Sequence, residues 1–347
     1  MKFVVKAWSN GGARAGILHL GTSTIDTPSL LLSTRKGLPH FISPDLLSCL
    51  PSPESRLLHI KPVEYMEMIS STRPELWATL ADEVPAWVSD KRNKTSVDRT
   101  IKWLDECISI SPASGAVFGA IVGGSSLEER RRCAQEVATR NVSGYWVGGL
   151  GLGESMDERP ALLNAVIEAL PEEKPRLICG LGLPEEILQG IAAGVDLFES
   201  TYVAQFTMYY HPTCLLTMLI AFTAIYRYIY HLTLGGFALT FPLDRTQINA
   251  SNLVPSDVGS DPRKINLRAT VFRKDTTPIV EGCTCYTCRN HTRAYINHLL
   301  NVHEMLAQIL LEIHNTHHFL GFFRLIRDAI NAGRFEEFRR EFVQRWR

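Results

Sequence analysis

Five short apolar runs alternate with amphipathic stretches through the middle of the chain. The runs are LWATLADE, AVFGAIVG, GYWVGGLGLG, PRLICGLG and GVDLFEST, at residues 76–83, 116–123, 144–153, 175–182 and 194–201. They show little polar alternation, which indicates strands of a parallel sheet that is covered on both faces. We therefore predict an α/β fold, either a (β/α)8 barrel or a doubly wound sheet.

The stretches between the runs have helical spacing. They cover residues 96–108, 126–140, 157–170 and 184–194. Ser126 opens the second stretch and is a typical N-cap residue. No GxGxxG motif opens a helix after the first strand, which disfavours a dinucleotide-binding fold. In a barrel the carboxyl ends of the strands carry the active site. The candidate functional residues at these strand ends are polar residues and glycines: Asp82, Glu83, Gly123, Gly124, those at 148–154, and Glu199.

Charge and the amino-terminal residues bear on partners and compartment. The 347 residues carry no formal net charge, so no global basic field attracts nucleic acid. The start of the chain lacks the long apolar core of a secretory signal, which predicts a reducing, cytoplasmic location. We expect the five dispersed cysteines to be buried free thiols. They are Cys49, Cys107, Cys133, Cys179 and Cys214.

A cysteine cluster follows near the C-terminus, in GCTCYTCRNHTRAYINHLL from Gly282. Cys283, Cys285 and Cys288 have the spacing C-x-C-x-x-C, and thiolates this close favour tetrahedral Zn²⁺. A redox pair is disfavoured because that motif belongs at the start of a βαβ unit. A helical histidine is the natural fourth ligand, and the spacing leaves His303, His314 and His317 open. Four protein ligands would close the site and make the metal structural.

Helical patterns continue from His291 to the C-terminus, with Gly333 as a predicted break. Their arginines could contact phosphate or form a solvated face. These are Arg324, Arg327, Arg334, Arg339, Arg340, Arg345 and Arg347. One upstream segment, 203–228, does not fit the pattern: its apolar run from Cys214 to Tyr226 is shorter than the roughly 20 residues of a membrane span.

The C-terminal motifs CTCYTCRNHTRAYINHLL, ILLEIHN and IRDAINAGRFEEF resemble the zinc-binding part of tRNA-guanine transglycosylases. VFGAIVGG, GYWVGGLGLGE and GVDLFES match the central strands of that family in order. The resemblance implies a (β/α)8 TIM barrel over residues 1–280 and a zinc-binding helical subdomain over 281–347. It also implies one structural Zn²⁺ per chain. The implied ligands are Cys283, Cys285, Cys288 and His314.

Several family positions are altered in this chain. The family's nucleophilic aspartate corresponds to Glu199 in LFES, its D-S-G-G motif is absent, and its glutamine corresponds to Gly123. The resemblance leaves a remnant of the substrate pocket, in which Asp82, Gly148 and Gly149 match residues that contact the base.

This pattern predicts a non-catalytic family member that pairs with a catalytic homologue as a heterodimer. The pair would exchange guanine for queuine at the anticodon wobble position of tRNAs with GUN anticodons, and this chain would help to position the tRNA. One alternative is an active transglycosylase with Glu199 as nucleophile. Another is a queuine-binding or membrane-tethering protein without a tRNA role. For the location, the periphery of the mitochondrial outer membrane is the alternative to the cytoplasm.

Residues 203–228 interrupt the family-like text. Joining Tyr202 to Ile229 gives GVDLFESTYIYHLTLGGFALTFPLD, which reads as a strand end followed by a short hairpin. Connections in such units usually have about 2–6 residues. We therefore predict that 203–228 is an atypical insertion in the barrel.

Overall fold

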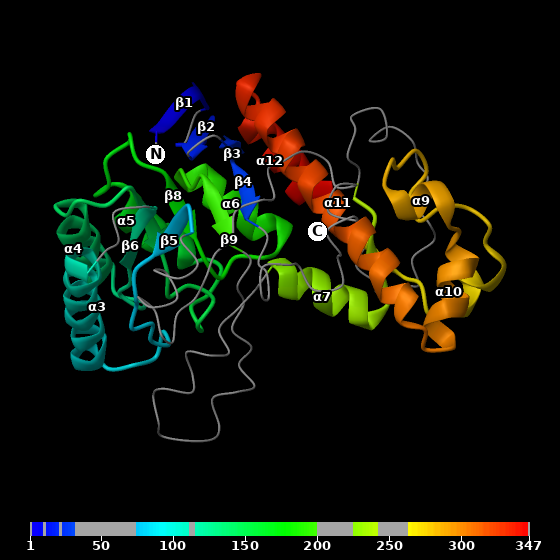
Figure 1. Cartoon of the computed structure of the whole chain (residues 1–347), viewed down its shortest axis with the longest axis horizontal. Coiled ribbons are helices and arrows are strands. Elements are labelled where there is room, and N and C mark those ends of the chain that lie inside the picture. Colours follow the sequence, from blue (N-terminus) through cyan, green and yellow to red (C-terminus); the bar gives the residue numbers. More distant parts are fainter. Residues whose placement is uncertain are drawn as a thin grey trace. The chain divides into compact units, whose positions relative to one another are not determined.

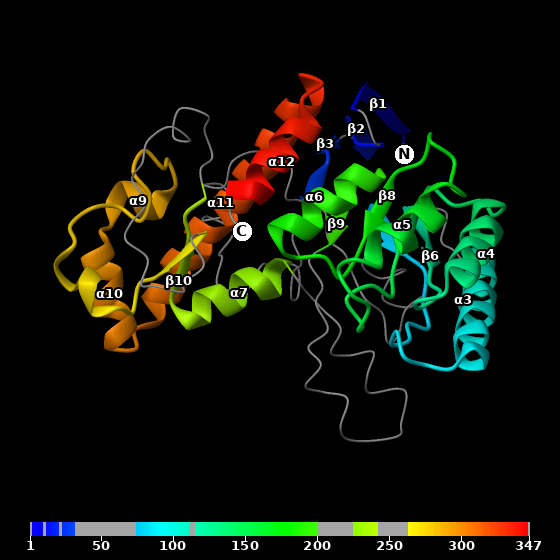
Figure 2. The same cartoon turned by 180° about the vertical axis from the view of Figure 1, so that it is seen from behind.

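The structure is a computed structural model that describes residues 2–9, 12–20, 23–31, 74–110, 115–199, 225–241 and 263–345. These residues form two compact units, which are described separately. The first holds the elements from β1 to β9 and α3 to α6, and the second is built from α7 to the C-terminal helices (Figures 1 and 2). Cys49, Cys214 and residues 203–224 of the predicted insertion lie outside the described residues.

A six-stranded parallel sheet organises the first unit, and this confirms the predicted α/β class. Its order is β4-β9-β8-β7-β6-β5, so the strands from β5 to β9 lie in chain order and β4 pairs with β9. The sheet curls as a half-barrel. The strands are β4 (Ser29–Leu31), β5 (Leu76–Ala78), β6 (Ala116–Ile121), β7 (Gly144–Val147), β8 (Arg176–Ile178) and β9 (Leu197–Glu199). The five predicted apolar runs each contain one of the strands β5 to β9.

Four helices connect these strands, and each packs against the next along the chain. They are α3 (Asp90–Ile110), α4 (Leu127–Ala138), α5 (Arg159–Ile167) and α6 (Pro184–Ala193). Crossovers between parallel strands are right-handed, so strands in chain order place successive helices on one face. Ser126 caps α4 as predicted, because its Oγ accepts a hydrogen bond from the Glu129 amide at 3.2 Å. Gly119 lets β6 approach α4, since a Cβ there would lie 2.5 Å from Cγ1 of Val137.

The opposite face of the sheet carries an apolar core of the first unit. Alternate residues of the parallel strands contribute to it, among them Phe118, Trp146 and Leu177. Leu18 and Ile25 join this core from a second sheet that the sequence reasoning did not predict. That sheet is antiparallel, with β1 (Lys2–Trp8), β2 (Arg14–Leu20) and β3 (Ser23–Thr27) in chain order.

The second unit is arranged along α11 (Met305–Asn331). Its other elements are α7 (Ile225–Gly235), β10 (Phe237–Leu239), β11 (Lys264–Asn266), the 3-10 helix η4 (Thr270–Lys274), α9 (Tyr286–Asn290), α10 (Arg293–Asn301) and α12 (Phe335–Arg345). The predicted break at Gly333 is confirmed, because this glycine separates α11 from α12 with φ of +66°.

The sequence predictions for residues 229–235 and for three of the five dispersed cysteines fall on residues that the structure describes. The predicted short hairpin after Tyr202 is wrong at residues 229–235, because these residues lie in helix α7. Their apolar residues Ile229 and Leu232, three apart and both buried, form one helical face. The prediction that Cys107, Cys133 and Cys179 are buried thiols outside disulfide bonds is confirmed. Every helix in the described ranges is too short or too polar to cross a membrane.

Candidate metal centre

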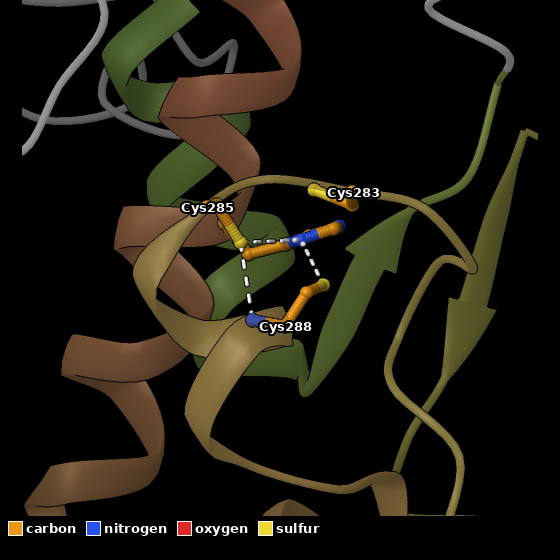
Figure 3. Close-up of side chains that lie close together, drawn as sticks. Cys283, Cys285 and Cys288 are labelled. Carbon is orange, nitrogen blue, oxygen red and sulfur yellow. Dashed lines mark hydrogen bonds between the residues drawn. The ribbon is translucent and has the colours of Figure 1, made fainter.

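Three cysteines are gathered on one short turn of the second unit, where α9 begins (Figure 3). Cys285 is the N-cap residue of α9, and its Sγ accepts a hydrogen bond from the Cys288 amide at 3.2 Å. The Cys283 amide donates to the Val280 carbonyl at 3.2 Å, which turns the preceding chain toward the same point. The C-x-C-x-x-C spacing and this local turn therefore bring the three sulfur atoms together.

His314 completes the cluster from the middle of α11 and is fully buried. Its Nδ1 lies 3.5 Å from Sγ of Cys285 and 3.3 Å from Sγ of Cys288. The four ligand atoms all lie within 4.8 Å of one another. A tetrahedral zinc ion with bonds of about 2.0–2.3 Å has ligand atoms roughly 3.5 Å apart. The sulfur-to-nitrogen distances agree with that spacing, so these residues could hold a metal ion.

The second nitrogen of His314 fixes the orientation of the ring. Nε2 donates to the Leu239 carbonyl at 2.9 Å. This contact leaves the lone pair of Nδ1 directed at the sulfurs, which is the arrangement that ligating histidines commonly adopt. The neighbouring Asn315 accepts a hydrogen bond from the Leu239 amide at 2.9 Å. His314 and Asn315, which are consecutive on α11, thus bind the end of β10, and the bond from His314 orients its imidazole ring toward the cysteines.

The charges in the cluster also favour a cation. Hydrogen bonds from Cys285 and Cys288 lower the pKa of the Cys283 thiol, while the same kind of contact with Cys283 and Cys285 raises the pKa of the Cys288 thiol. Burial lowers the pKa of His314, but its bonds to Cys283 and Cys285 outweigh burial and raise the pKa to about 10. The thiols cannot all ionise easily by themselves. A divalent cation would let all three do so.

The other histidines considered from the sequence lie differently. His303 is exposed in the turn between α10 and α11, outside the cluster. His317 contacts the Cys283 thiol but is not one of the four clustered residues. His318 is buried beside His314, with ring centroids 5.3 Å apart, and its Nε2 bonds to the Phe241 carbonyl. The structure therefore brings His314 to the cysteines.

The predicted pocket remnant lies in the first unit, at the carboxyl edge of the parallel sheet. Asp82 follows β5 and is almost fully buried. Arg92 donates to both of its carboxylate oxygens, at 2.8 and 2.9 Å, and Arg99 donates to Oδ2 at 2.7 Å. Asp82 therefore holds two guanidinium groups from the first half of α3.

Gly148 and Gly149 follow β7, and their backbone groups are bonded within the chain. The Gly149 amide donates to Oε1 of Glu83 at 2.5 Å. Arg130, fully buried on α4, donates to the carbonyls of Gly148 and Gly149 at 3.2 and 2.6 Å. Burial lowers the pKa of Arg130 to about 10. Glu199 ends β9, and its side chain lies outside the described residues.

The sequence reasoning did not assign Arg92, Arg99 or Arg130 to this edge. A signal existed for Arg130, which shares a helical face with the buried Cys133, Ala134 and Val137. A lone arginine on an apolar face of a helix needs a buried partner. No comparable signal marks Arg92 and Arg99, because both are partly exposed.

Fold and site together define an α/β protein with a curled parallel sheet and, in a C-terminal helical unit, a Cys₃His cluster that could hold a metal ion. Residues 51–347 match the family model described as queuine tRNA-ribosyltransferase. The chain belongs to this family, the tRNA-guanine transglycosylases. The family resemblance inferred from the sequence motifs is thereby confirmed.

Similar proteins are named "Queuine tRNA-ribosyltransferase accessory subunit 2". The Danio rerio protein is 35% identical over 301 residues, covering 83% of this chain and 70% of its own length. The Xenopus tropicalis protein is 40% identical over 280 residues, with 75% and 64% covered. The Homo sapiens protein is 35% identical over 299 residues, with 78% and 66% covered. The chain thus spans about two thirds of the length of the curated relatives it matches.

Proposed function

We propose that this chain is the non-catalytic subunit of a queuine tRNA-ribosyltransferase, in which a homologous partner exchanges guanine for queuine in tRNA. The observation that carries the proposal is the similarity to several proteins named as accessory subunits. Glu199 at the position of the family's nucleophilic aspartate supports the same reading, since a carboxylate displaced by about 1 Å can lower a rate 10²-fold.

The edge of the parallel sheet supports this assignment. Asp82, which matches a base-reading residue of the family, already has Arg92 and Arg99 as partners. The amide of Gly149 is bonded to Glu83. A purine base would have to displace these internal contacts, and breaking buried hydrogen bonds costs free energy. The edge is therefore a poor site for independent base exchange.

The metal in this proposal is one Zn²⁺ per chain, bound by the three clustered cysteines and His314. Thiolate and imidazole ligands in tetrahedral geometry are the usual zinc set. All four positions are protein atoms, so no position is left for water or substrate. The ion would join the α9 turn to α11, and through His314 to the end of β10, as a structural clamp.

The curled sheet would belong to a complete (β/α)8 barrel. Among the described residues, β4 is the first strand of this sheet along the chain and β9 is the last. Their pairing supports a barrel, because the first and last strands of a closed barrel are neighbours. The boundary near residue 280 and the insertion at 203–228 remain predictions from the sequence.

A cytoplasmic location remains a further prediction. Fractionation of cells expressing the tagged chain would test it, with mitochondrial membranes as the alternative fraction.

A surface for the catalytic partner is available on the second unit. Tyr286 and Tyr295, on α9 and α10, are 43% and 39% exposed. His291 lies between them and stacks on Tyr295, with centroids 5.2 Å apart and planes 15° apart. Exposed, ordered aromatic rings are typical of the central residues of protein interfaces. We assign this surface to the catalytic subunit.

Base exchange into tRNA tests the proposal directly. Labelled guanine incorporation would be measured for the chain alone, for a catalytic homologue alone and for the two together. We expect exchange only when both are present. Substantial exchange by the chain alone would identify an active transglycosylase instead, and full activity of the homologue alone would remove the role of this chain.

A measurement of subunit affinity tests the proposed interface separately. Tyr295→Ala should weaken the heterodimer, measured by analytical ultracentrifugation, because it removes an aromatic contact. Leu127→Ala is the matched control, since Leu127 is 44% exposed and belongs to α4 of the first unit. Equal subunit affinity in the Tyr295→Ala and Leu127→Ala variants would show that the partner binds elsewhere.

A further inference from the structure

A second buried histidine lies beside the Cys₃His cluster. His318 follows His314 by four residues on α11, so the two side chains share one face of that helix. Their ring centroids are 5.3 Å apart and their planes differ by 33°. His318 is only 1% exposed, and its ring packs edge-on against Phe241 with centroids 4.7 Å apart. His318 therefore belongs to the packed interior around the cluster.

His318 binds the backbone in the same way as His314. Nε2 of His318 donates to the Phe241 carbonyl, as Nε2 of His314 donates to the Leu239 carbonyl. The two carbonyls are two residues apart in and after β10, and the residue between them still bonds to the residue before β11. Carbonyls two residues apart in a paired strand point to the same side. The two rings therefore present Nε2 to one chain, and each has its Nδ1 turned away from that chain.

Nδ1 of His318 is the nitrogen left for another partner. A neutral imidazole whose Nε2 donates a hydrogen bond has its lone pair on Nδ1. This atom is buried and has no hydrogen-bond partner among the residues that the structure describes. Cys283 is nevertheless close enough to interact with the ring. Burying a polar atom without a partner costs free energy, so a bond to the metal of the cluster would stabilise it.

Cys283 is the cysteine that interacts with His318. Cys285 and Cys288 are joined by a bond at the start of α9, and Nδ1 of His314 contacts the sulfur atoms of both (Figure 3). Cys283 precedes that helix and is half-buried. Nδ1 of His318 is not one of the four clustered ligand atoms. Loss of Cys283 from the metal would therefore open a position beside His318.

The charge of the site favours such a replacement. Three thiolates, one neutral imidazole and a divalent cation leave a net negative charge, whereas two thiolates and two imidazoles leave none. A net charge in a buried site has a high desolvation cost. Imidazole is as ordinary a zinc ligand as thiolate. Exchange of the Cys283 thiolate for the His318 imidazole would therefore give a neutral site with four protein ligands.

We propose that His318 is a reserve ligand, whose Nδ1 binds the metal whenever Cys283 does not. In the exchange, Sγ of Cys283 leaves with its electron pair and takes a proton from water, and Nδ1 supplies its own lone pair to the metal. A Cys₂His₂ site then replaces the Cys₃His site. The inference rests on the metal in the proposed function and does not depend on the tRNA role of the chain.

Zinc binding by the whole chain tests the inference. Cys283→Ala should keep about one zinc ion per chain, because His318 takes the vacant position. Adding His318→Gln should weaken zinc binding at least about tenfold in competition with a chromophoric chelator, since one ligand is then missing. Glutamine keeps an N–H group for the Phe241 carbonyl, so the contact of α11 with β10 is preserved. His318→Gln alone should keep the ion, because the four clustered ligands remain.

His317 supplies the matched control. It also contacts the Cys283 thiol, but it is half-buried, so water can satisfy its nitrogen atoms. Cys283→Ala with His317→Gln should therefore bind zinc as tightly as Cys283→Ala alone.

X-ray absorption at the zinc edge counts the ligands and needs no change at His318. The wild-type chain should show three sulfur atoms and one imidazole around the ion, as the cluster provides. Cys283→Ala should show two sulfur atoms and two imidazoles, which outer-shell scattering from the rings distinguishes from water.

Cys283→Ala protein without zinc, or with a single imidazole at the ion, would overturn the inference. So would equal zinc affinity of the Cys283→Ala protein with and without His318→Gln, or a loss confined to the His317→Gln combination. A wild-type chain that binds no zinc would refute the proposed metal and this inference with it. None of these results decides the base-exchange experiment, so the proposed tRNA role stands or fails separately.

Discussion

Nε2 of His314 donates to the carbonyl of Leu239 at 2.9 Å, and this bond decides which nitrogen faces the cysteines. With Nε2 engaged, Nδ1 is the nitrogen available to a metal, 3.3 Å from Sγ of Cys288. A backbone carbonyl cannot be removed by an ordinary substitution. The orientation of the histidine is therefore insensitive to side-chain changes in β10, and the ligands themselves are the residues to alter.

Cys288→Ala should release the metal. Three protein ligands hold zinc much less tightly than four, and the binding free energy of a structural ion contributes directly to folding. Metal content by elemental analysis should fall from about one ion per chain to near zero, with a lower melting temperature. Cys107→Ala, at a buried thiol outside the cluster, should keep its metal. A metal-replete Cys288→Ala protein would exclude this cysteine as a ligand.

Asp196 and Arg14 form a buried ion pair in the first unit, with Nη2 to Oδ2 at 2.7 Å and both side chains fully buried. Asp196→Ala should lower the free energy of unfolding by about 3–5 kcal/mol, because it leaves a buried guanidinium without its counter-ion. Arg14→Met combined with Asp196→Leu should cost less than Asp196→Ala alone. Urea unfolding of Asp196→Ala, of the double variant and of its two single substitutions measures this, and strict additivity of the two sites would argue against direct coupling.

Asp275 should make stability depend on pH in the acid range. Burial opposes its charge, but hydrogen bonds from Thr277 and the ion pair with Arg293 outweigh burial and lower its pKa below 3.8. A carboxyl with a lowered folded pKa stabilises the protein above its unfolded value, and this stabilisation is lost as pH falls through the folded value.

Asp275→Asn should therefore cost about 1 kcal/mol near neutral pH, the usual net value of such partly exposed bonds. The difference from the wild type should shrink as pH falls below 3.8. Chemical unfolding of both proteins at several pH values measures it. A difference that stays constant down to pH of about 2.5 would mean that the charge of Asp275 contributes nothing.

The parallel sheet was predictable because each strand is a local property of the sequence. Runs such as AVFGAIVG are apolar on both faces, and a turn or cap such as Ser126 follows. The antiparallel β1–β3 sheet was not predicted. β1 is only half-buried along most of its length, so its sequence lacks the strong periodic contrast that identifies a core strand.

The metal centre shows a similar division between local and long-range information. The three cysteines are placed by the turn before α9, which their spacing already specifies. His314 and His317 lie within one turn of α11, and the choice between them depends on the rotation of that helix against β10. The partners of Asp82, Arg92 and Arg99, also come from another element. The contact of His314 with the cysteines and that of Asp82 with the two arginines therefore could not be predicted from the sequence alone.

Glu199→Ala should leave base exchange by the reconstituted heterodimer almost unchanged. Glu199 ends β9, where the family's aspartate attacks the ribose, but the reacting carboxylate in the proposed complex belongs to the partner. The extra methylene of glutamate would shift a carboxylate by about one bond length, and such misplacement lowers catalysis. Initial rates of guanine incorporation at saturating tRNA measure the effect. The matched control replaces the catalytic partner's own nucleophile and should abolish exchange. A loss of about a hundredfold or more in the Glu199→Ala heterodimer would instead assign Glu199 a catalytic role.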